Sequence, residues 1–263
     1  MNDFEYHRPA SVADATRLLG AAADGRYLGG GQSLLPAMKM GLSAPSALVE
    51  VVRIPRLKGL RVDGATLVVG AGTTHAEVAA SADVRRAIPA LAALADLIGD
   101  PAVRSAGTLG GSLALNDPAA CYPAGVLGLG ATVRTDRREI AADDFFRGMY
   151  ETALEPGELI VEVAFPIPEK ASWQKFKQPA SRFSLVGVFV SRGPAGVRVA
   201  VTGAASCVFR ATAFERALAT DWSAKALAGL AQDADGLNAD LHASAAYRAH
   251  LVGVLARRGV AAA

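Results

Sequence analysis

The chain has 263 residues, of which 51% are hydrophobic and 20% charged. This composition favours a packed core and excludes an intrinsically disordered chain. The formal net charge is +2, from 27 Lys and Arg against 25 Asp and Glu, so nothing in the charge points to nucleic acid or an anionic membrane.

The two cysteines, Cys121 and Cys207, lie far apart in the sequence. They exclude a disulfide framework and any cysteine-rich metal or iron–sulfur site within this chain. The N-terminal residues lack the basic and apolar regions of a secretory signal, and no apolar run reaches the roughly 18 residues of a membrane span. We therefore expect a cytosolic protein bound to larger partners, through which it can lie at the inner face of the membrane.

Residues 1–56 are predicted to form a first, small α/β unit. Ser11 is expected to cap a helix in which Asp14 takes the capping-box position, and Gly20 or Gly25 is expected to end it. The other expected elements are an extended segment, a short strand, a helical turn and an apolar strand, at 3–9, 27–28, 36–41 and 47–52.

Residues 57–170 are predicted to form a second unit that opens with a hairpin at 60–70, turning at Asp63-Gly64. Thr73 or Thr74 is expected to cap the next helix, and an Ala- and Leu-rich helix at 88–98 is expected to be buried. Gly99-Asp100-Pro101 is expected to stop it. The remaining elements are a helix or turn at 123–130 and strands at 131–135, 139–141 and 158–165.

Residues 171–263 are predicted to form a third unit. Strands are expected at 173–176, 185–191 and 197–203, with a turn at 193–196. Helices are expected at 210–219, 223–231 and 244–258. Arg257 and Arg258 are interpreted as basic residues at a helix C-terminus, where they complement the helix dipole.

Two glycine-rich stretches carry the functional signal: the first glycine segment, residues 28–36, and the second, residues 107–114. Glycine allows backbone N–H groups to point at a ligand, and consecutive free N–H groups form an anion-binding nest. Neither segment contains a basic residue. We interpret them as two loops that clamp the pyrophosphate of one dinucleotide, helped by the side chains of Gln32, Ser33, Thr108 and Ser112.

Several other sites are excluded by spacing. The first segment is not a Rossmann fingerprint, because its third glycine position is occupied by Leu34. A P-loop and a Gly-x-Ser-x-Gly nucleophile elbow are absent. His75 and Glu77 have the spacing of a zinc deaminase but lack the paired cysteines, so His75 is interpreted as a packing or helix-surface residue. No metal site and no catalytic acid or base is nominated.

Four stretches resemble the medium, flavin-binding subunits of molybdenum hydroxylases, the carbon-monoxide-dehydrogenase-like and xanthine-dehydrogenase-like enzymes. They are residues 29–39, 98–120, 151–160 and 242–251. The resemblance implies an α+β fold, with a two-part FAD-binding domain of the vanillyl-alcohol-oxidase (PCMH) type followed by a C-terminal domain of a small antiparallel sheet and helices.

The resemblance also implies a set of FAD contacts. Ile98 would pack against the flavin or the adenine, and Lys177, with Lys175 as the second choice, would place a cation near the flavin. The full set is Gly29, Gly30, Gly31, Gln32, Ser33, Leu34, Ile98, Thr108, Gly110, Gly111, Ser112, Asp117, Leu159, Ile160 and Lys177. Two positions depart from the family: Cys121 replaces an acidic residue, and Asn116 replaces a His or Ala. Asp117 has an alternative interpretation as a turn residue before Pro118.

By this resemblance the protein is the FAD subunit of a heterotrimeric, molybdenum-containing oxidoreductase. A large partner would hold molybdopterin, and a small partner would pass electrons from [2Fe–2S] clusters to FAD and on to quinone, NAD or O₂. Two alternatives stay open. One is a free-standing FAD oxidase or dehydrogenase, which the scarcity of catalytic side chains argues against. The other is an interaction subunit that has lost FAD, which Cys121 suggests.

Overall fold

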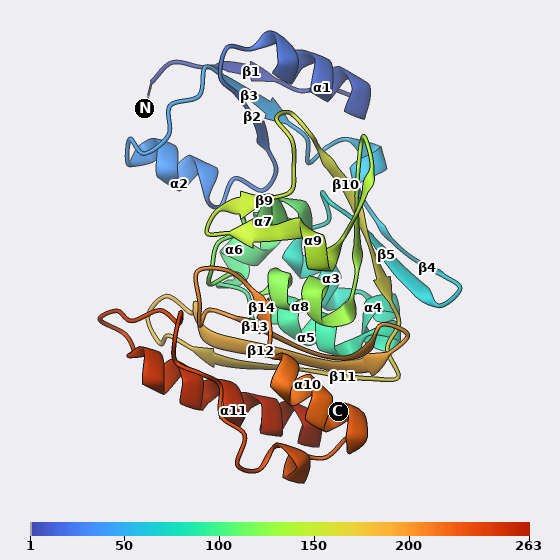
Figure 1. The fold of residues 1–263 in the computed structure, drawn as a ribbon. Helices are drawn as coiled ribbons and strands as arrows, with labels where there is room; N and C mark the ends of the chain where they lie inside the picture. The colour runs from blue at the N-terminus through green and yellow to red at the C-terminus, as the bar shows by residue number, and fades with distance from the viewer. Residues whose placement is uncertain (1) are drawn as a thin grey trace.

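A computed structural model describes residues 2–263 and contains three main sheets in chain order, together with a small two-stranded ribbon (Figure 1). The first sheet is parallel, in the order β1-β3-β2. Ser11 caps its helix as predicted, because its hydroxyl oxygen accepts the N–H of Asp14 at 3.1 Å. The predicted glycine stops are wrong: the helix ends at Ala21, with Gly20 inside it. The elements are β1 (Glu5–His7), α1 (Val12–Ala21), β2 (Gly25–Leu28), α2 (Leu34–Lys39) and β3 (Ala47–Glu50).

The second sheet is antiparallel, in the order β4-β5-β10-β6-β7, and begins with the predicted hairpin. Thr74 caps the following helix through a complete capping box with Glu77. The strands are β4 (Leu60–Asp63), β5 (Thr66–Gly70), β6 (Thr132–Thr135), β7 (Glu139–Ala141) and β10 (Ile160–Pro166), preceded by a short 3₁₀ turn, η1 (Pro55–Leu57). A separate two-stranded ribbon pairs β8 (Phe146–Gly148) with β9 (Glu151–Thr152).

The helices of this region are more numerous than predicted. They are α3 (His75–Ala80), α4 (Ala82–Ala87), α5 (Pro89–Asp96), α6 (Pro101–Ala106), α7 (Leu109–Leu115), α8 (Tyr122–Leu129) and α9 (Ala142–Phe145). Pro101 opens α6 rather than only ending the preceding helix, because the Asp100 carboxylate accepts the N–H of Val103 at 2.9 Å. Most of the second glycine segment, expected as a loop, is the helix α7, capped by Thr108.

The third sheet is antiparallel, in the order β11-β12-β13-β14: β11 (Lys170–Lys177), β12 (Ser184–Gly193), β13 (Gly196–Thr202) and β14 (Phe209–Arg210). Helices α10 (Thr212–Thr220) and α11 (Ala245–Ala262) lie beside it (Figure 1). The helix predicted at 223–231 is only a 3₁₀ turn, η2 (Ala224–Leu227). The predicted position of Arg257 and Arg258 is also wrong, because α11 continues past both residues to Ala262.

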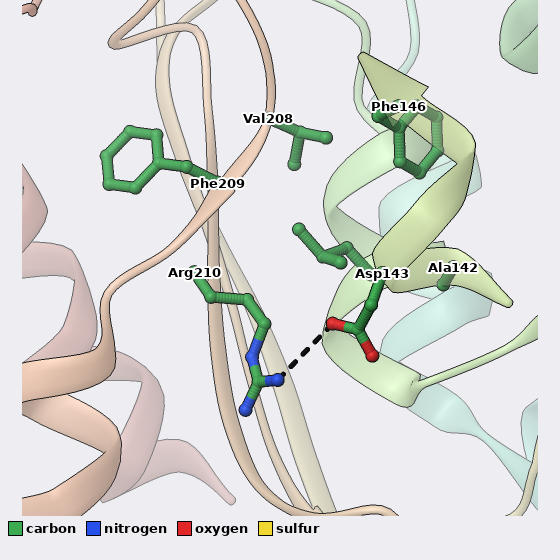
Figure 2. A pocket seen from close by; sticks show the side chains of 7 residues that line it. Ala142, Asp143, Phe146, Val208, Phe209 and Arg210 are labelled. Carbon is green, nitrogen blue, oxygen red and sulfur yellow. Dashed lines mark hydrogen bonds and ion pairs between the residues drawn. The ribbon is translucent and has the colours of Figure 1, made fainter. Parts of the chain in front are cut away.

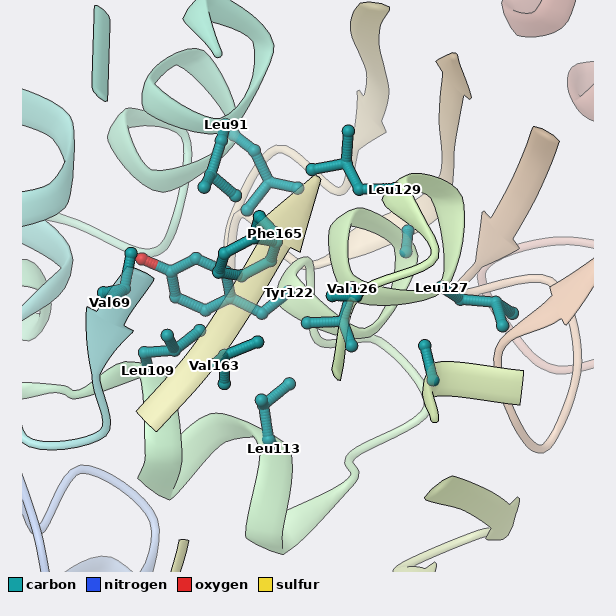
Figure 3. Packing of buried hydrophobic residues seen from close by; sticks show 14 of the residues in the cluster. Val69, Leu91, Leu109, Leu113, Tyr122, Val126, Leu127, Leu129, Val163 and Phe165 are labelled. Atoms are coloured by element: carbon teal, nitrogen blue, oxygen red, sulfur yellow. The ribbon is translucent and has the colours of Figure 1, made fainter. Parts of the chain in front are cut away.

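The main core lies between the second and third sheets. Figure 3 shows Tyr122 of α8 packed among Val69, Leu109 and Phe165, and all four side chains are buried. The predicted helix at 88–98 is α5, which is buried in this core. A second cluster joins the third sheet to α10 and α11, and a third joins the first sheet to Leu159 and Val161.

These three sheets with their helices confirm the α+β fold predicted from the resemblance. The C-terminal antiparallel sheet with flanking helices is also present as predicted. Among residues 2–263, no helix combines the length and the hydropathy that a membrane crossing needs.

Candidate functional site

The two glycine segments are in direct contact. A Cβ added to Gly30 would lie 2.0 Å from the carbonyl oxygen of Ala106 and 2.5 Å from the Cα of Gly107. Both neighbours are backbone atoms, which cannot rotate away as a side chain can. A Cβ on Gly29 would lie 3.0 Å from the hydroxyl oxygen of Thr108. Glycine is therefore required here because two backbones approach each other, and the structure brings the two predicted halves of the site together.

The first segment provides a run of free donors. From Gly29 to Leu34, no backbone N–H donates to any atom of residues 2–263, whereas the carbonyls of Gly31 and Ser33 already accept from the start of α2. Gly31 has φ of +69°, which favours glycine. Gln32 and Ser33 are exposed, and Ser33 makes no side-chain cap. Six successive unpaired N–H groups are the kind of nest predicted for a pyrophosphate.

The second segment is different, and the prediction of free N–H groups there is wrong. The N–H of Leu109 donates to Thr73 and that of Gly110 to Ala71, at 3.1 and 2.8 Å. Gly111 and Ser112 donate to the hydroxyl and the carbonyl of Thr108, at 3.2 and 3.1 Å. Capping of α7 consumes these donors. What this segment offers is close backbone approach to the first segment and the hydroxyls of Thr108 and Ser112.

Asp117 lies in a tight turn after α7. Its carboxylate accepts the N–H of Ala119 at 2.8 Å and the hydroxyl of Tyr150 at 3.3 Å. Burial, and then the carboxylate of Asp117, raise the pKa of Tyr150. The contact with Ala119 supports the alternative interpretation of Asp117 as a turn residue.

The preceding residue, Asn116, is buried and left-handed, with φ of +48°. Its side-chain amide donates to the carbonyls of Gly148 and Glu151, both at 2.8 Å, and so holds the turn that carries Tyr150. Tyr150 is also left-handed, with φ of +57°. No local sequence pattern predicts the contacts of Tyr150, because its partners Asn116 and Asp117 are more than 30 positions away.

The predicted flavin-facing residues separate into two groups. The first group lies together: Nζ of Lys175 donates to the carbonyl of Leu97 at 2.8 Å and lies 3.4 Å from Sγ of Cys121, next to Ile98. The second group lies elsewhere. Lys177 is exposed beyond a bulge in β11, and Leu159 and Ile160 are buried in the core. Their contact with a cofactor stays a prediction.

His75 is a buried packing residue, as one of the two interpretations predicted. Burial, and then the nearby Arg104, lower the pKa of its imidazole to about 4, so it is neutral at physiological pH. Its ring lies 5.3 Å from that of Tyr122, and a Cβ on Gly107 would be 2.6 Å from its Nε2. The His75 ring therefore packs against Gly107, the first residue of the second glycine segment.

A cavity of about 200 Å³ lies between α9 and β14 (Figure 2). It is lined by Leu127, Ala142, Asp143, Phe146, Val208, Phe209 and Arg210, and an Arg210–Asp143 ion pair of 3.3 Å crosses it. Both charges have further partners: Arg210 also pairs with Glu215, and Asp143 with Arg198. None of the predicted cofactor residues lines this cavity, so it is a feature separate from the glycine segments.

The residues present fit an FAD pyrophosphate. An anion with several acceptor oxygens matches the six free N–H groups and the hydroxyls of Ser33, Thr108 and Ser112. No carboxylate belongs to either segment. Within residues 2–263 there is no group of three or more His, Cys, Asp or Glu side chains arranged to hold a metal ion.

The comparisons with known proteins agree with this chemistry. Residues 2–168 match the model of a family described as the FAD binding domain in molybdopterin dehydrogenase. The carbon monoxide dehydrogenase medium chain of Hydrogenophaga pseudoflava is 34% identical over 99% of this chain and 96% of its own length. The nicotine 6-hydroxylase medium subunit of Paenarthrobacter nicotinovorans is 35% identical over 97% and 95%. Quinoline 2-oxidoreductase from Pseudomonas putida 86 superposes with a TM-score of 0.89 at 30% identity, covering 100% of this chain and 97% of that one.

Proposed function

Because the chain belongs to the family of FAD-binding domains of molybdopterin dehydrogenases, we propose that it carries electrons between a partner's [2Fe–2S] clusters and an external acceptor. It is the FAD-binding medium subunit of a molybdenum hydroxylase and hence part of an oxidoreductase. When bound, FAD supplies the redox chemistry, accepting and releasing electrons one or two at a time. The residues of this chain bind, orient and shield it.

The observation that carries the proposal is the run of free N–H groups from Gly29 to Leu34 against the backbone of Gly107. These N–H groups would hold the pyrophosphate oxygens without a cationic side chain. The hydroxyls of Thr108 and Ser112 would donate from the opposite segment. Ile98 would lie against the ring system, and Lys175 would supply a positive charge nearby.

The partners follow from what this chain lacks. No group of metal-ligating side chains is found in residues 2–263, so oxidation of a substrate at molybdenum and the [2Fe–2S] clusters would belong to a large and a small partner subunit. The relatives named above are similarly close to this chain, although their names specify carbon monoxide, nicotine and quinoline. This supports a substrate pocket on the large subunit rather than here. The acceptor would be quinone, NAD or O₂.

The test is isolation of the intact complex from its native source through a tag on this chain. We expect molybdenum, iron and FAD in the purified complex, and bleaching of the visible flavin absorbance when substrate is added anaerobically. A complex that contains FAD but neither molybdenum nor iron would contradict the proposal. So would turnover of substrate by this chain alone.

A further inference from the structure

The turn that follows α5, residues 97–99, is held by three cationic side chains from three different segments. Its three successive carbonyl oxygens accept hydrogen bonds from these side chains, and the carbonyl of Gly99 is shared, because Arg104 Nη1 also donates to it at 3.4 Å. The pairs are Lys175 Nζ to Leu97 O at 2.8 Å, Arg104 Nη1 to Ile98 O at 3.0 Å and Arg182 Nη1 to Gly99 O at 3.5 Å. Cations are favourable at a helix C-terminus, where carbonyls lack partners.

The loop between β11 and β12 is built to place Arg182. Arg182 has φ of +63°, a conformation that costs a non-glycine residue about 1 kcal/mol or more. The carbonyl of Gln178 accepts the N–H of Arg182 at 2.8 Å, and the Gln178 side chain accepts that of Ser181 at 2.7 Å. Such strain persists only where the surroundings fix it, so the loop fixes the backbone from which the exposed Arg182 side chain extends.

The three cations are poorly neutralised. Among residues 2–263, neither Lys175 nor Arg182 has a carboxylate within ion-pair distance, and Arg104 has only the exposed Asp96 at 3.9 Å. The second contact of Lys175 is the buried thiol of Cys121, at 3.4 Å, which is a weak acceptor. The turn therefore carries an excess of positive charge.

This turn is close to the proposed pyrophosphate site. Helix α6 connects the two, and its six residues span about 9 Å. The same helix carries Arg104, which reaches back to the carbonyl of Ile98, and ends at Gly107, whose backbone touches Gly30. One FAD molecule held at the glycine segments can reach the turn.

We propose that Arg104, Lys175 and Arg182 form a cationic clamp that positions turn 97–99 against bound FAD and keeps a positive charge beside it. The inference rests on the proposed FAD site and deepens it. The three side chains act through the turn and are positioning residues. Cys121 leaves the positive charge of Lys175 unneutralised, because an aspartate at position 121 would form an ion pair with Lys175.

The test measures FAD affinity by fluorescence titration, and the reduction potential of bound FAD, in the full-length chain. Arg104→Met and Lys175→Met are each expected to weaken FAD binding about tenfold or more, since each removes a hydrogen bond from a charged donor. Arg104→Lys should recover part of the affinity. Lys175→Met and Cys121→Asp should both make the potential more negative. The matched control is Lys170→Met, an exposed lysine at the start of the same strand β11, which should change neither quantity.

Melting temperatures of the FAD-free variants separate positioning from folding. If Arg104→Met does not fold, Arg104→Lys and Lys175→Met carry the test. Equal affinities and potentials for Lys175→Met and Lys170→Met would overturn the clamp. A wild-type chain that binds no FAD would overturn the proposed function as well, whereas wild-type binding with unchanged variants would overturn only the clamp.

Discussion

Replacing Gly30 with alanine tests the contact between the two glycine segments. The new Cβ would lie 2.0 Å from the carbonyl oxygen of Ala106, where an ordinary contact is 3.4 Å or more. The segments would therefore have to separate by more than 1 Å. Because the obstructing atoms are backbone, rotation of a side chain cannot relieve the overlap.

Overpacking of this kind costs about 1–3 kcal/mol. If the overlap destabilises only the FAD-bound protein, FAD affinity falls by roughly 5- to 150-fold. If the overlap destabilises the apo protein, its melting temperature falls by roughly 2 to 12 °C for a chain of this size. We expect the loss mainly in affinity, because Gly30 carries one of the free N–H groups that would hold the pyrophosphate.

The assay is fluorescence titration of the apo chain with FAD, accompanied by thermal unfolding. Gly20→Ala is the matched control, since a Cβ at Gly20 in α1 meets no atom within 4 Å. We expect wild-type affinity for Gly20→Ala and the loss described above for Gly30→Ala. Unchanged affinity together with an unchanged melting temperature in Gly30→Ala would refute the contact between the two segments.

Three further substitutions test the framework. Burial alone would raise the pKa of Glu162, but hydrogen bonds from Arg61, Arg56 and Arg134 outweigh burial and lower the pKa to about 2. The ionised carboxylate therefore contributes roughly 3 kcal/mol to the free energy of unfolding above pH 4.5, and this contribution is lost as the pH falls towards 2. Urea unfolding of Glu162→Gln should show reduced stability at pH 7 and a weaker pH dependence between 4.5 and 2; a wild-type pH profile would contradict this. Arg248→Met leaves the carbonyls of Leu185 and Gly203 without their buried donor and should cost about 3 kcal/mol or more, measured by the urea midpoint, and a loss under about 1 kcal/mol would argue against the network. Thr108→Val removes the cap that accepts from Gly111 and should cost about 1 kcal/mol by the same measurement, whereas an unchanged midpoint would show that the cap is dispensable.

Local structure is predicted correctly from the sequence where one short-range interaction determines it. Ser11 with Asp14, the turn at Asp63-Gly64 and the capping box of Thr74 with Glu77 are each set within a few residues. The buried helix at 88–98 could also be predicted from its apolar composition, because a helix that is apolar all round has to be buried.

The incorrect predictions have both tertiary and local causes. Glycines at 110 and 111 suggested a loop, but Gly110 is required because a Cβ would lie 2.6 Å from that of Ala71, while Thr108 supplies a helix cap. Pro101 suggested a stop, although Asp-Pro is equally a helix start.

Lys175 and Lys177 could not be ranked from a strand pattern, because residues two apart point to the same face of a regular strand. A bulge between Phe176 and Lys177 breaks that regularity. Only the structure shows that Lys175 is the lysine that reaches Leu97 and Cys121.

The central claim is that this chain binds FAD through the free N–H groups of Gly29–Leu34. The most direct measurement is the visible absorption spectrum of the purified full-length chain after incubation with FAD and removal of unbound cofactor. The account predicts a yellow protein with flavin bands, containing FAD in stoichiometric amount. A colourless chain that folds cooperatively yet retains no FAD would contradict it.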